Sequence, residues 1–283
     1  MLDTGLRRRS VAAGTEEREF PFTTGDFQAI AALLRDQAGI SLANSKAPLV
    51  YGRLARRVRA LQLNDFGTYV AFVQSPAGEA ERRHMLTALT TNVTSFFREA
   101  HHFEHLRTEI LQSDGGPIRL WSAACSTGQE AYSLAAVIAS LLPDQHRLQA
   151  RILATDIDPV VLQQAQAGQY SSIDGVPPGL RQWFPRSGAV WTVDPALRRM
   201  ISFKLLNLNA EWPIKRPFDA VLCRNVAIYF DPEHQARLWS ALAAVIRPGG
   251  SLCIGHSERV SGPATGQFEN IGMTTYRRRS DPA

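Results

Sequence analysis

The sequence contains little cysteine and no long apolar run. Its 283 residues include three cysteines, and a small, odd number favours reduced thiols over a framework of disulfides. The longest apolar runs, Leu134 to Leu142 and Trp239 to Ile246, are far shorter than the roughly 20 residues that a membrane-spanning helix needs. The basic cluster Arg7 to Arg9 is not followed by an apolar segment, which argues against a secretory signal. These absences predict a cytoplasmic protein without direct membrane insertion, with a disordered tail over residues 1–19.

The chain also lacks a large excess of charge of either sign. It carries 31 basic and 26 acidic side chains, which gives a net charge of +5 with histidine neutral. A solvated basic surface accounts for this surplus, although it also permits an acidic partner such as nucleic acid, anionic lipid or an acidic protein face. Internal repeats and low-complexity tracts are absent, and a chain of this length can form one large domain or two smaller ones.

The region from Phe20 to about Ser95 is predicted to be almost wholly helical, and one of its helices is strongly one-sided. On a helical wheel of Lys46 to Leu61, apolar residues at a four-residue spacing gather on one side. The opposite side carries five basic residues and no acidic one: Lys46, Arg53, Arg56, Arg57 and Arg59. Neighbouring cations repel one another. The stripe is therefore interpreted either as a solvated face or as a docking surface for an acidic partner.

From Ile118 onward, predicted strands alternate with predicted helices. The strands are Ile118–Trp121, Arg151–Asp156, Phe203–Leu208, Phe218–Cys223, Ser251–Gly255 and a final edge strand, Thr274–Arg278. This alternation predicts a parallel sheet covered by helices, with its ligand site at the carboxyl ends of the strands. Between about 170 and 200, glycine and proline interrupt the pattern. We expect a small insertion there, with a hairpin through Ala189–Val193.

A turn of small residues joins the first strand to its helix. Residues Ser122 to Gly128 read SAACSTG, and Glu130 stands at the start of the helix that follows. Small side chains let a ligand approach the backbone, and the free amides of a helix N-terminus point outward at such a turn. An ordinary strand-to-helix turn would have the same composition. The residues at the other strand ends are therefore needed to distinguish a ligand-binding turn from an ordinary one.

Two polar residues follow neighbouring strands and favour a nucleoside ligand. Asp156 ends one strand and Asn225 follows another, and a carboxylate in such a place can accept both hydroxyls of an adenosine ribose. The dinucleotide fingerprint is absent, since the turn has one glycine, Gly128, in place of three. A ligand with a ribose, no phosphates and a cationic amino acid end for Glu130 fits better. S-adenosylmethionine is such a ligand.

His101 and His105 stand four residues apart on a predicted helix, which is a spacing compatible with metal binding. No neighbouring cluster of Cys, Asp or Glu completes a site in the sequence. We therefore expect no metal.

Seven motifs occur in a fixed order along the chain. They are KAPLVYGRLARRVRAL, TTNVTSFFREAHHF, WSAACSTGQEAYSLA, ATDID, FKLLNL, CRNVAIYFD and PGGSLCIGHSE. Together they resemble the chemotaxis methyltransferases of the CheR family, which esterify receptor glutamates, over roughly Phe20 to Arg278. Any one motif alone would not be specific.

The resemblance implies an α/β fold of two domains. A Rossmann-like S-adenosylmethionine-dependent methyltransferase domain, with a small inserted β-subdomain, is preceded by an all-helical N-terminal domain. We expect the helical receptor-docking domain over 20–89, a linker and connecting helix over 90–117, and the methyltransferase domain over 118–283 with its insertion at about 170–200. The cofactor would be S-adenosylmethionine, the product S-adenosylhomocysteine, and no metal would take part.

The resemblance also implies roles for particular residues. Those expected around the cofactor are Asn92, Thr94, Arg98, Gly128, Glu130, Asp156, Asn207, Leu208, Asn225 and Val226. Glu130 would hold the methionyl ammonium group and Asp156 the ribose. Arg98 and Tyr229 would position the substrate carboxylate, although Tyr229 is equally explained by packing at a helix start. The basic helix would meet the acidic side of the receptor's helical bundle.

Two departures from the family pattern bear on the partners. Gln129 stands where an acidic residue is common in the family's turn. The segment around Pro185 to Pro195 is short and poor in glycine, whereas members that bind a receptor tail peptide carry a longer, glycine-rich loop there. Tethering to a tail peptide is therefore doubtful, and we expect a monomer without a nucleic-acid partner.

The implied reaction is in-line transfer of a sulfonium methyl group to a glutamate oxygen. A glutamate side chain, with a pKa of about 4.3, is ionised at neutral pH, so no general base is needed. Two alternatives stay open: a methyltransferase that acts on nucleic acid or a small molecule, and a signalling module that binds S-adenosylmethionine without turnover.

Overall fold

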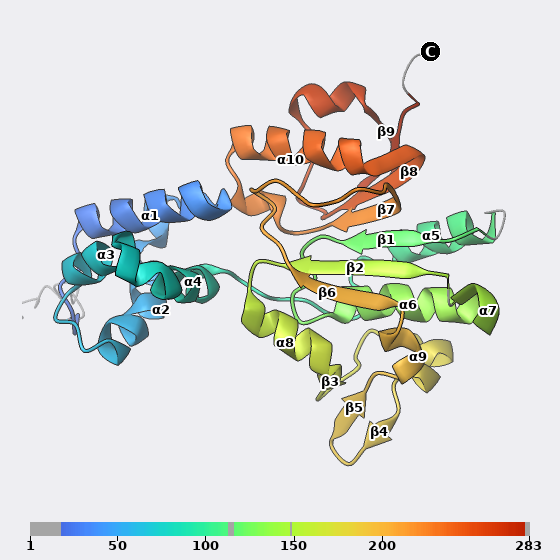
Figure 1. Cartoon of the computed structure of the whole chain (residues 1–283), viewed down its shortest axis with the longest axis horizontal. Coiled ribbons are helices and arrows are strands. Elements are labelled where there is room, and N and C mark those ends of the chain that lie inside the picture. The colour runs from blue at the N-terminus through green and yellow to red at the C-terminus, as the bar shows by residue number, and fades with distance from the viewer. Residues whose placement is uncertain (1–17, 113–115, 148, 281–283) are drawn as a thin grey trace, which may run out of the picture.

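The computed structural model describes residues 18–112, 116–147 and 149–280. Figure 1 shows a group of helices on one side and a helix-covered sheet on the other. Of the tail that the sequence predicts to be disordered, residues 1–17 lie outside the described range. Among the described residues, no helix is long and apolar enough to cross a membrane.

The N-terminal part is helical, as predicted. Its elements are α1 (Thr24–Ala38), the 3-10 turn η1 (Asn44–Lys46), α2 (Ala47–Ala60), α3 (Phe66–Gln74), the 3-10 turn η2 (Pro76–Gly78) and α4 (Glu79–Leu89). Hydrogen bonds from N-cap side chains define where two of these helices begin. Thr23 and Asp26 form a capping box at α1, and the Asp65 carboxylate caps α3. The apolar side of α2 is buried against the other helices, which confirms the predicted one-sided helix.

The C-terminal part is built on a seven-stranded sheet with the order β6-β2-β1-β7-β8-β10-β9. Its strands are β1 (Arg119–Ser122), β2 (Arg151–Asp156), β6 (Ile201–Leu205), β7 (Phe218–Cys223), β8 (Ile246–Ile254), β9 (Phe268–Gly272) and β10 (Thr275–Arg278). The five strands from β6 to β8 run parallel, while β10 pairs antiparallel with both β8 and β9. The strand order reverses between β1 and β7, and ligand sites form at such a switch point.

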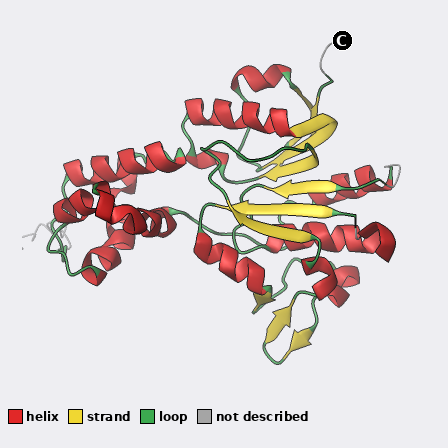
Figure 2. Cartoon of the chain, in the orientation of Figure 1, coloured by secondary structure: helices red, strands yellow, loops and turns green. Residues whose placement is uncertain are grey.

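Helices cover both faces of this sheet. They are α5 (His101–Leu111), α6 (Gln129–Leu141), α7 (Asp144–Arg147), α8 (Pro159–Ala167) and α10 (Pro232–Val245). Figures 1 and 2 show α10 on one side of the sheet and α6 and α8 on the other. Along β7, Val221 and Cys223 belong to the core beneath α10, while Ala220 and Leu222 belong to the core beneath α6. Burial on both faces explains why the strand is almost continuously apolar.

One strand prediction is wrong in its position. The strand predicted at Thr274–Arg278 is not an edge strand, because β10 lies between β8 and β9. The true edge is β9, whose sequence FENIG carries mostly exposed residues and gives little strand signal. In addition, β8 begins at Ile246, which pairs with Phe218 before the Pro-Gly-Gly segment interrupts the register.

The insertion forms a small three-stranded sheet with the order β3-β5-β4. Its elements are β3 (Gln169–Tyr170), the 3-10 turn η3 (Pro178–Trp183), β4 (Arg186–Ser187), β5 (Val190–Thr192) and α9 (Pro195–Arg198). The predicted hairpin is present as the antiparallel pair of β4 and β5. Figure 1 shows this unit beyond α6 and α8.

Candidate functional site

A cleft of about 410 Å³ opens at the carboxyl ends of the parallel strands. The ends of β1, β2 and β7 form one wall. The connection between α1 and α2 and the linker after α4 form the other. In Figure 1 the strands β1, β2 and β7 point towards the helical part, so the cleft lies where the two parts of the chain meet.

The small-residue turn forms part of the lining of this cleft. Ala123, Ala124 and Ser126 line it, and Ser126 has a positive φ of 48°. Gly128 is not among the lining residues. Its φ is +95°, and a Cβ at this position would meet Ala165 at 2.9 Å. The structure thus gives Gly128 a packing role against α8, and the close approach to a ligand is provided by the residues before it.

Asp156 presents a buried carboxylate to the cleft. Its Oδ2 accepts a hydrogen bond from the Ser126 amide at 2.8 Å, and its Oδ1 accepts from the Asp158 amide at 3.0 Å. Burial raises the pKa of Asp156, and the backbone amides oppose that shift. These two bonds leave other lone pairs of the carboxylate for ligand hydroxyls.

Glu130 is already engaged within the chain. Its Oε1 accepts from Ser122 Oγ at 2.6 Å, and its Oε2 pairs with Arg224 Nε at 2.6 Å. Arg224 also donates to the carbonyl of Arg98, and its guanidinium lies 5.5 Å from the centre of the Phe103 ring. Arg224 is only 7% exposed but lines the cleft. An incoming ammonium group would therefore join a carboxylate that is shared with Arg224.

Glu258 holds the loop after β7 by hydrogen bonds, although it lies far from that loop in the sequence. Its carboxylate accepts from the amides of Asn225 and Val226, both at 2.9 Å, and from those of Gly255, Ala227 and Ile228. Asn225 itself has a positive φ of 58°. Burial raises the pKa of Glu258, and the amides oppose that shift. Sequence reasoning missed this role because the amides that it binds come mostly from another segment.

The linker after α4 lines the cleft and is fixed to the segments that follow β1 and β2. Asn92 Nδ2 donates to Asp158 Oδ2 at 2.9 Å, and the Asn92 carbonyl accepts from Ser126 Oγ at 2.9 Å. The Arg98 guanidinium donates to the Val93 carbonyl at 3.0 Å. Asn92, Thr94 and Arg98 all line the cleft.

The helical part closes the other side of the cleft. Ile40 and Phe230 form an antiparallel bridge, and the Ser41 amide donates to the Tyr229 carbonyl at 2.7 Å. Asn207 Nδ2 donates to the Gln37 carbonyl at 2.6 Å. These bonds hold the connection between α1 and α2 against the strand ends.

Four of the five basic residues lie on α2 and Lys46 directly precedes it, and three of the five are bound by groups of other elements. Arg53 donates to the carbonyls that end α4, including that of Leu89 at 3.0 Å. Arg57 pairs with the buried Glu81 at 2.5 Å. Arg59 pairs with Glu19. The remaining two, Lys46 and Arg56, are exposed, and Lys46 lines the cleft.

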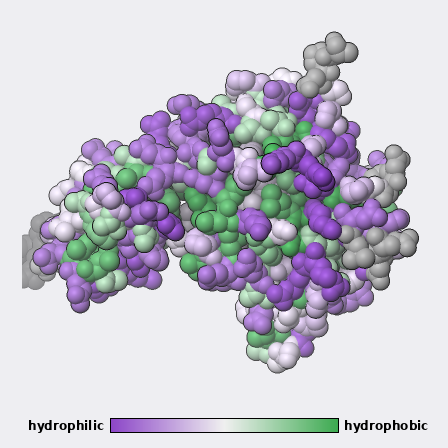
Figure 3. Space-filling model, viewed as in Figure 1, coloured by the Kyte–Doolittle hydropathy of each residue, from purple (hydrophilic) through white to green (hydrophobic). Residues whose placement is uncertain are grey.

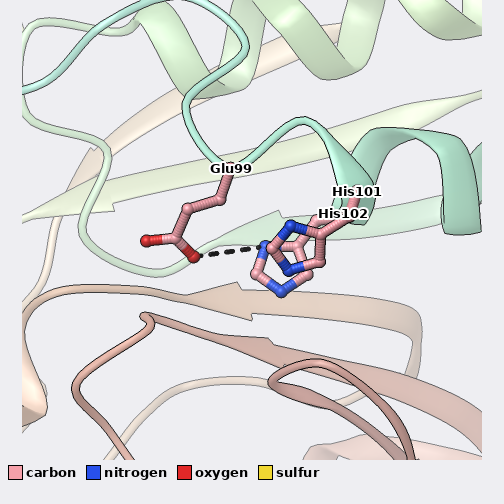
Figure 4. Close-up of side chains that lie close together, drawn as sticks. All are labelled: Glu99, His101 and His102. Atoms are coloured by element: carbon pink, nitrogen blue, oxygen red, sulfur yellow. Dashed lines mark ion pairs between the residues drawn. The ribbon is translucent and has the colours of Figure 1, made fainter.

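The histidines are arranged differently from the predicted pair. His105 turns to Ser251, with Nε2 at 2.9 Å from Oγ. Glu99, His101 and His102 come together instead, with their potential ligand atoms within 4.8 Å of one another (Figure 4). Sequence reasoning overlooked Glu99 because it paired His101 with His105 and found no cluster of Cys, Asp or Glu beside them.

The charges around this cluster do not suit a cation. The Arg224 guanidinium lies 3.3 Å from His102 Nδ1, and His102 Nε2 faces Thr274 Oγ1 at 3.0 Å. Burial and then the Arg224 charge lower the pKa of His102 to about 3. Burial alone would raise the pKa of Glu99, but a hydrogen bond from His256 and the Arg224 charge lower it. A fixed guanidinium thus already neutralises this site, and we keep the expectation of no metal as a prediction.

The cleft brings most of the predicted residues together. Those that line it are Asn92, Thr94, Arg98, Glu130, Asp156, Asn207, Leu208, Asn225, Val226, Tyr229 and Lys46. Gly128, Arg53, Arg56, Arg57 and Arg59 do not line it. A nucleoside-sized cleft at a switch point, with a buried carboxylate and no glycine-rich phosphate loop, is typical of S-adenosylmethionine-dependent methyltransferases.

Comparison with protein families agrees with this class. Residues 92–277 match the family described as "CheR methyltransferase, SAM binding domain", and residues 25–90 match "CheR methyltransferase, all-alpha domain". The chain belongs to the CheR methyltransferase family, and it is an S-adenosylmethionine-dependent methyltransferase. The resemblance and the fold class inferred from the motifs are thereby confirmed.

Individual relatives cover nearly the whole chain. A "Probable chemotaxis protein methyltransferase" of Rhizobium etli is 48% identical, over 87% of this chain and 96% of the relative. A "Chemotaxis protein methyltransferase" of Klebsiella aerogenes is 39% identical over 96% of both chains. "Chemotaxis protein methyltransferase 2" of Pseudomonas aeruginosa is 40% identical, over 92% of this chain and 95% of that protein.

Proposed function

We propose that this protein transfers methyl groups from S-adenosylmethionine to glutamate side chains of chemoreceptors, as part of sensory adaptation. The products are glutamate methyl esters and S-adenosylhomocysteine. The observation that carries the proposal is that one cleft is lined both by the buried carboxylate of Asp156 and by the side chains of Arg98 and Tyr229. The printed names of the relatives supply the chemotaxis context.

The residues of the cleft fit the cofactor. Asp156 is a buried carboxylate with acceptor capacity for the ribose hydroxyls, and the Ala123-Ala124 backbone allows close approach. The Glu130 and Arg224 pair offers opposite charges to the two ends of an amino acid. Asn207, Leu208, Asn225 and Val226 would surround the adenine. When bound, S-adenosylmethionine supplies an electrophilic methyl group on a sulfonium sulfur.

The acceptor needs no proton transfer from the protein. A glutamate carboxylate is ionised at neutral pH, so one oxygen forms the new bond to carbon while the bond from sulfur to carbon breaks. The chain's contribution is positioning. Arg98 uses one of its five N–H donors on the Val93 carbonyl, and the others are available for the non-attacking oxygen of the carboxylate. Tyr229 lines the same cleft, and its side chain carries a hydroxyl donor.

Isotope-labelled S-adenosylmethionine tests the proposal directly. The protein is incubated with labelled cofactor and with membranes that contain chemoreceptors, and the labelled receptor is then treated with mild alkali. Release of labelled methanol is the expected result, because carboxyl methyl esters hydrolyse readily. Label that survives alkali on nucleic acid or a small molecule would favour a different methyltransferase. Cofactor binding without any transfer would favour the signalling module.

The same proposal covers the partner and the cellular location. The receptor's acidic helical bundle would be met by the cleft and by two exposed cations, Lys46 just before α2 and Arg56 on α2. The protein would act as a cytoplasmic monomer, without a metal and without nucleic acid. The β4 to β5 hairpin has a single glycine, Gly188, at its turn, so tail-peptide tethering is not part of the proposal.

A further inference from the structure

The insertion contacts the small-residue turn without lining the cleft. No residue from 169 to 200, a stretch that the structure describes in full, lines the cleft. In Figure 3 the hairpin end of the insertion projects away from the hydrophobic side chains that gather between the helical part and the strands. Its first strand, β3, nevertheless ends at Tyr170, whose hydroxyl donates to the Thr127 carbonyl at 2.7 Å. Thr127 belongs to the small-residue turn after β1.

The small-residue turn has a backbone conformation that needs support from other segments. Ser126 and Gly128, on either side of Thr127, have positive φ angles of 48° and 95°. A left-handed conformation is costly for serine, so contacts with the surrounding structure must maintain it. The Ser126 amide donates to Asp156, and the Ser126 hydroxyl donates to the Asn92 carbonyl. The hydrogen bond to the Thr127 carbonyl is the support that the insertion adds.

Gly128 gives the Tyr170 hydroxyl the room to reach this carbonyl. A Cβ at Gly128 would lie 3.0 Å from the Tyr170 hydroxyl oxygen and 2.9 Å from the Ala165 Cβ. Burial raises the pKa of Tyr170, so its hydroxyl stays protonated and can donate at neutral pH. The single glycine of the turn thus serves a contact with the insertion as well as the packing against α8.

The insertion also packs against the linker after α4. The centre of the Phe96 ring lies 4.9 Å from that of Tyr170 and 5.1 Å from that of Phe184, and both pairs meet edge to face. A Cβ at Gly175 would collide with the Phe96 carbonyl, so the backbone of the insertion comes close to the linker too. Arg98, which lines the cleft, follows two residues after Phe96. The insertion therefore supports both the turn and the linker.

We infer that Tyr170 is a positioning residue through which the insertion holds the small-residue turn in the conformation that binds S-adenosylmethionine. Without the hydrogen bond to the Thr127 carbonyl, the turn would adopt this conformation for only part of the time, and the affinity for the cofactor would fall by that fraction. The ring contact between Phe96 and Tyr170 does not need the hydroxyl, so the linker would stay in place. This inference rests on the proposed function and adds to it a group outside the cleft.

A second tyrosine provides a matched control. Tyr132 on α6 donates its hydroxyl to the Ala165 carbonyl at 2.7 Å, which belongs to α8 and not to the turn. Burial raises the pKa of Tyr132 as it does that of Tyr170. Tyr170→Phe and Tyr132→Phe each remove one such hydroxyl, so urea denaturation should show a loss of stability in both. Only Tyr170→Phe should weaken the binding of S-adenosylhomocysteine, by about tenfold in calorimetry.

Methyl transfer to a purified cytoplasmic fragment of a chemoreceptor gives a second readout. In Tyr170→Phe, KM for S-adenosylmethionine should rise by a similar factor, while KM for the receptor fragment stays near the wild-type value. A wild-type affinity for S-adenosylhomocysteine in Tyr170→Phe would overturn the inference, as would an equal loss of affinity in Tyr132→Phe. If Tyr170→Phe is partly unfolded, the three proteins are compared in sucrose, which favours the folded state. Failure of the wild-type protein to bind S-adenosylhomocysteine would instead refute the proposed function.

Discussion

Arg224 neutralises a buried carboxylate at the centre of the site. Its guanidinium pairs with Glu130 and also contacts the Arg98 carbonyl and His102. Replacing Arg224 by Met would leave Glu130 buried without its cation. We expect Arg224→Met to lower the free energy of unfolding by about 3–5 kcal/mol, as measured by urea denaturation. It should also weaken the binding of S-adenosylhomocysteine in calorimetry.

A paired substitution provides the control for Arg224. The double variant Arg224→Met with Glu130→Gln removes both charges, so it should recover part of the stability that Arg224→Met loses. Arg224→Lys keeps the charge but not the planar fork and should fall between wild type and Arg224→Met. Wild-type stability in Arg224→Met would contradict the role assigned to this ion pair.

Asp156 should decide whether the nucleoside binds. In Asp156→Ala the ribose would lose a charged acceptor, and each such hydrogen bond contributes about 1.5–3 kcal/mol. We therefore expect the affinity for S-adenosylhomocysteine to fall at least about a hundredfold in calorimetry. Urea denaturation of the same variant separates this effect from unfolding, since the amides of Ser126 and Asp158 also lose their acceptor. Retained affinity in a folded variant would refute the ribose role.

His102 should make the fold sensitive to acid. Burial, followed by the Arg224 charge, lowers its pKa to about 3 in the folded protein, against about 6.5 for an exposed histidine. Between these two values the unfolded chain binds the extra proton, so stability rises with pH and is lost as pH falls below about 6.5. From pH 7 to pH 5 this one group should cost about 2 kcal/mol.

The test for His102 is the slope of stability against pH. Urea denaturation at several pH values should show a shallower slope in His102→Gln than in the wild type, whatever the absolute stability of the variant. The exposed His84 provides the matched control, and the slope of His102→Gln is compared with that of His84→Gln. An unchanged slope in His102→Gln would mean that other groups cause the acid sensitivity.

The site residues that could be predicted from the sequence are those that lie at or directly after the end of a predicted strand. Asp156 ends one recognisable strand and Asn225 follows another, so their meeting in one cleft follows from the topology. Arg224 and Glu258 could not be found in this way. An arginine after a buried strand has no visible partner in sequence, and Glu258 binds amides 31 to 33 residues away. Their roles are set by tertiary contacts.

At the scale of elements, the hydrophobic periodicity of a segment predicts whether it forms a helix or a strand. It predicts less well which other element packs against that segment. The one-sided pattern of α2 correctly indicated its buried face. The same pattern could not show that Glu81 of α4 would lie against Arg57. The edge strand was misplaced for a related reason, since β10 has the stronger strand signal but β9 occupies the edge.

The cations of α2 should therefore divide into two groups. Arg56→Glu alters an exposed residue that does not line the cleft, so KM for the receptor fragment should rise, with the effect weakened by salt and cofactor affinity unchanged. Arg57→Glu would instead place a second carboxylate beside Glu81, because Arg57 pairs with Glu81. Glu81 is only 5% exposed, so water would screen the repulsion poorly. It should lower the midpoint of urea denaturation with or without receptor. Equal stability of Arg57→Glu and wild type would contradict the pairing.

At the scale of the whole molecule, the two parts of the chain share one cleft. Helix α1 is tied to the start of α10 by the pair of Arg35 and Asp231, whose atoms are 2.7 Å apart. The pair of Ile40 and Phe230 continues this contact to the loop after β7. The cleft is lined by residues of both parts, so a ligand that fills it would stabilise their contact as well as the sheet.

Binding of S-adenosylhomocysteine should therefore protect backbone amides on both sides of the cleft. Hydrogen exchange, measured by mass spectrometry with and without ligand, should slow in residues 40–46 and 90–98 as well as at the ends of β1, β2 and β7. At about a hundred times its dissociation constant, the ligand should add about 2.7 kcal/mol to stability. The hairpin of β4 and β5, which does not line the cleft, serves as the internal control. Protection confined to the strand ends would mean that the helical part closes the cleft without taking part in binding.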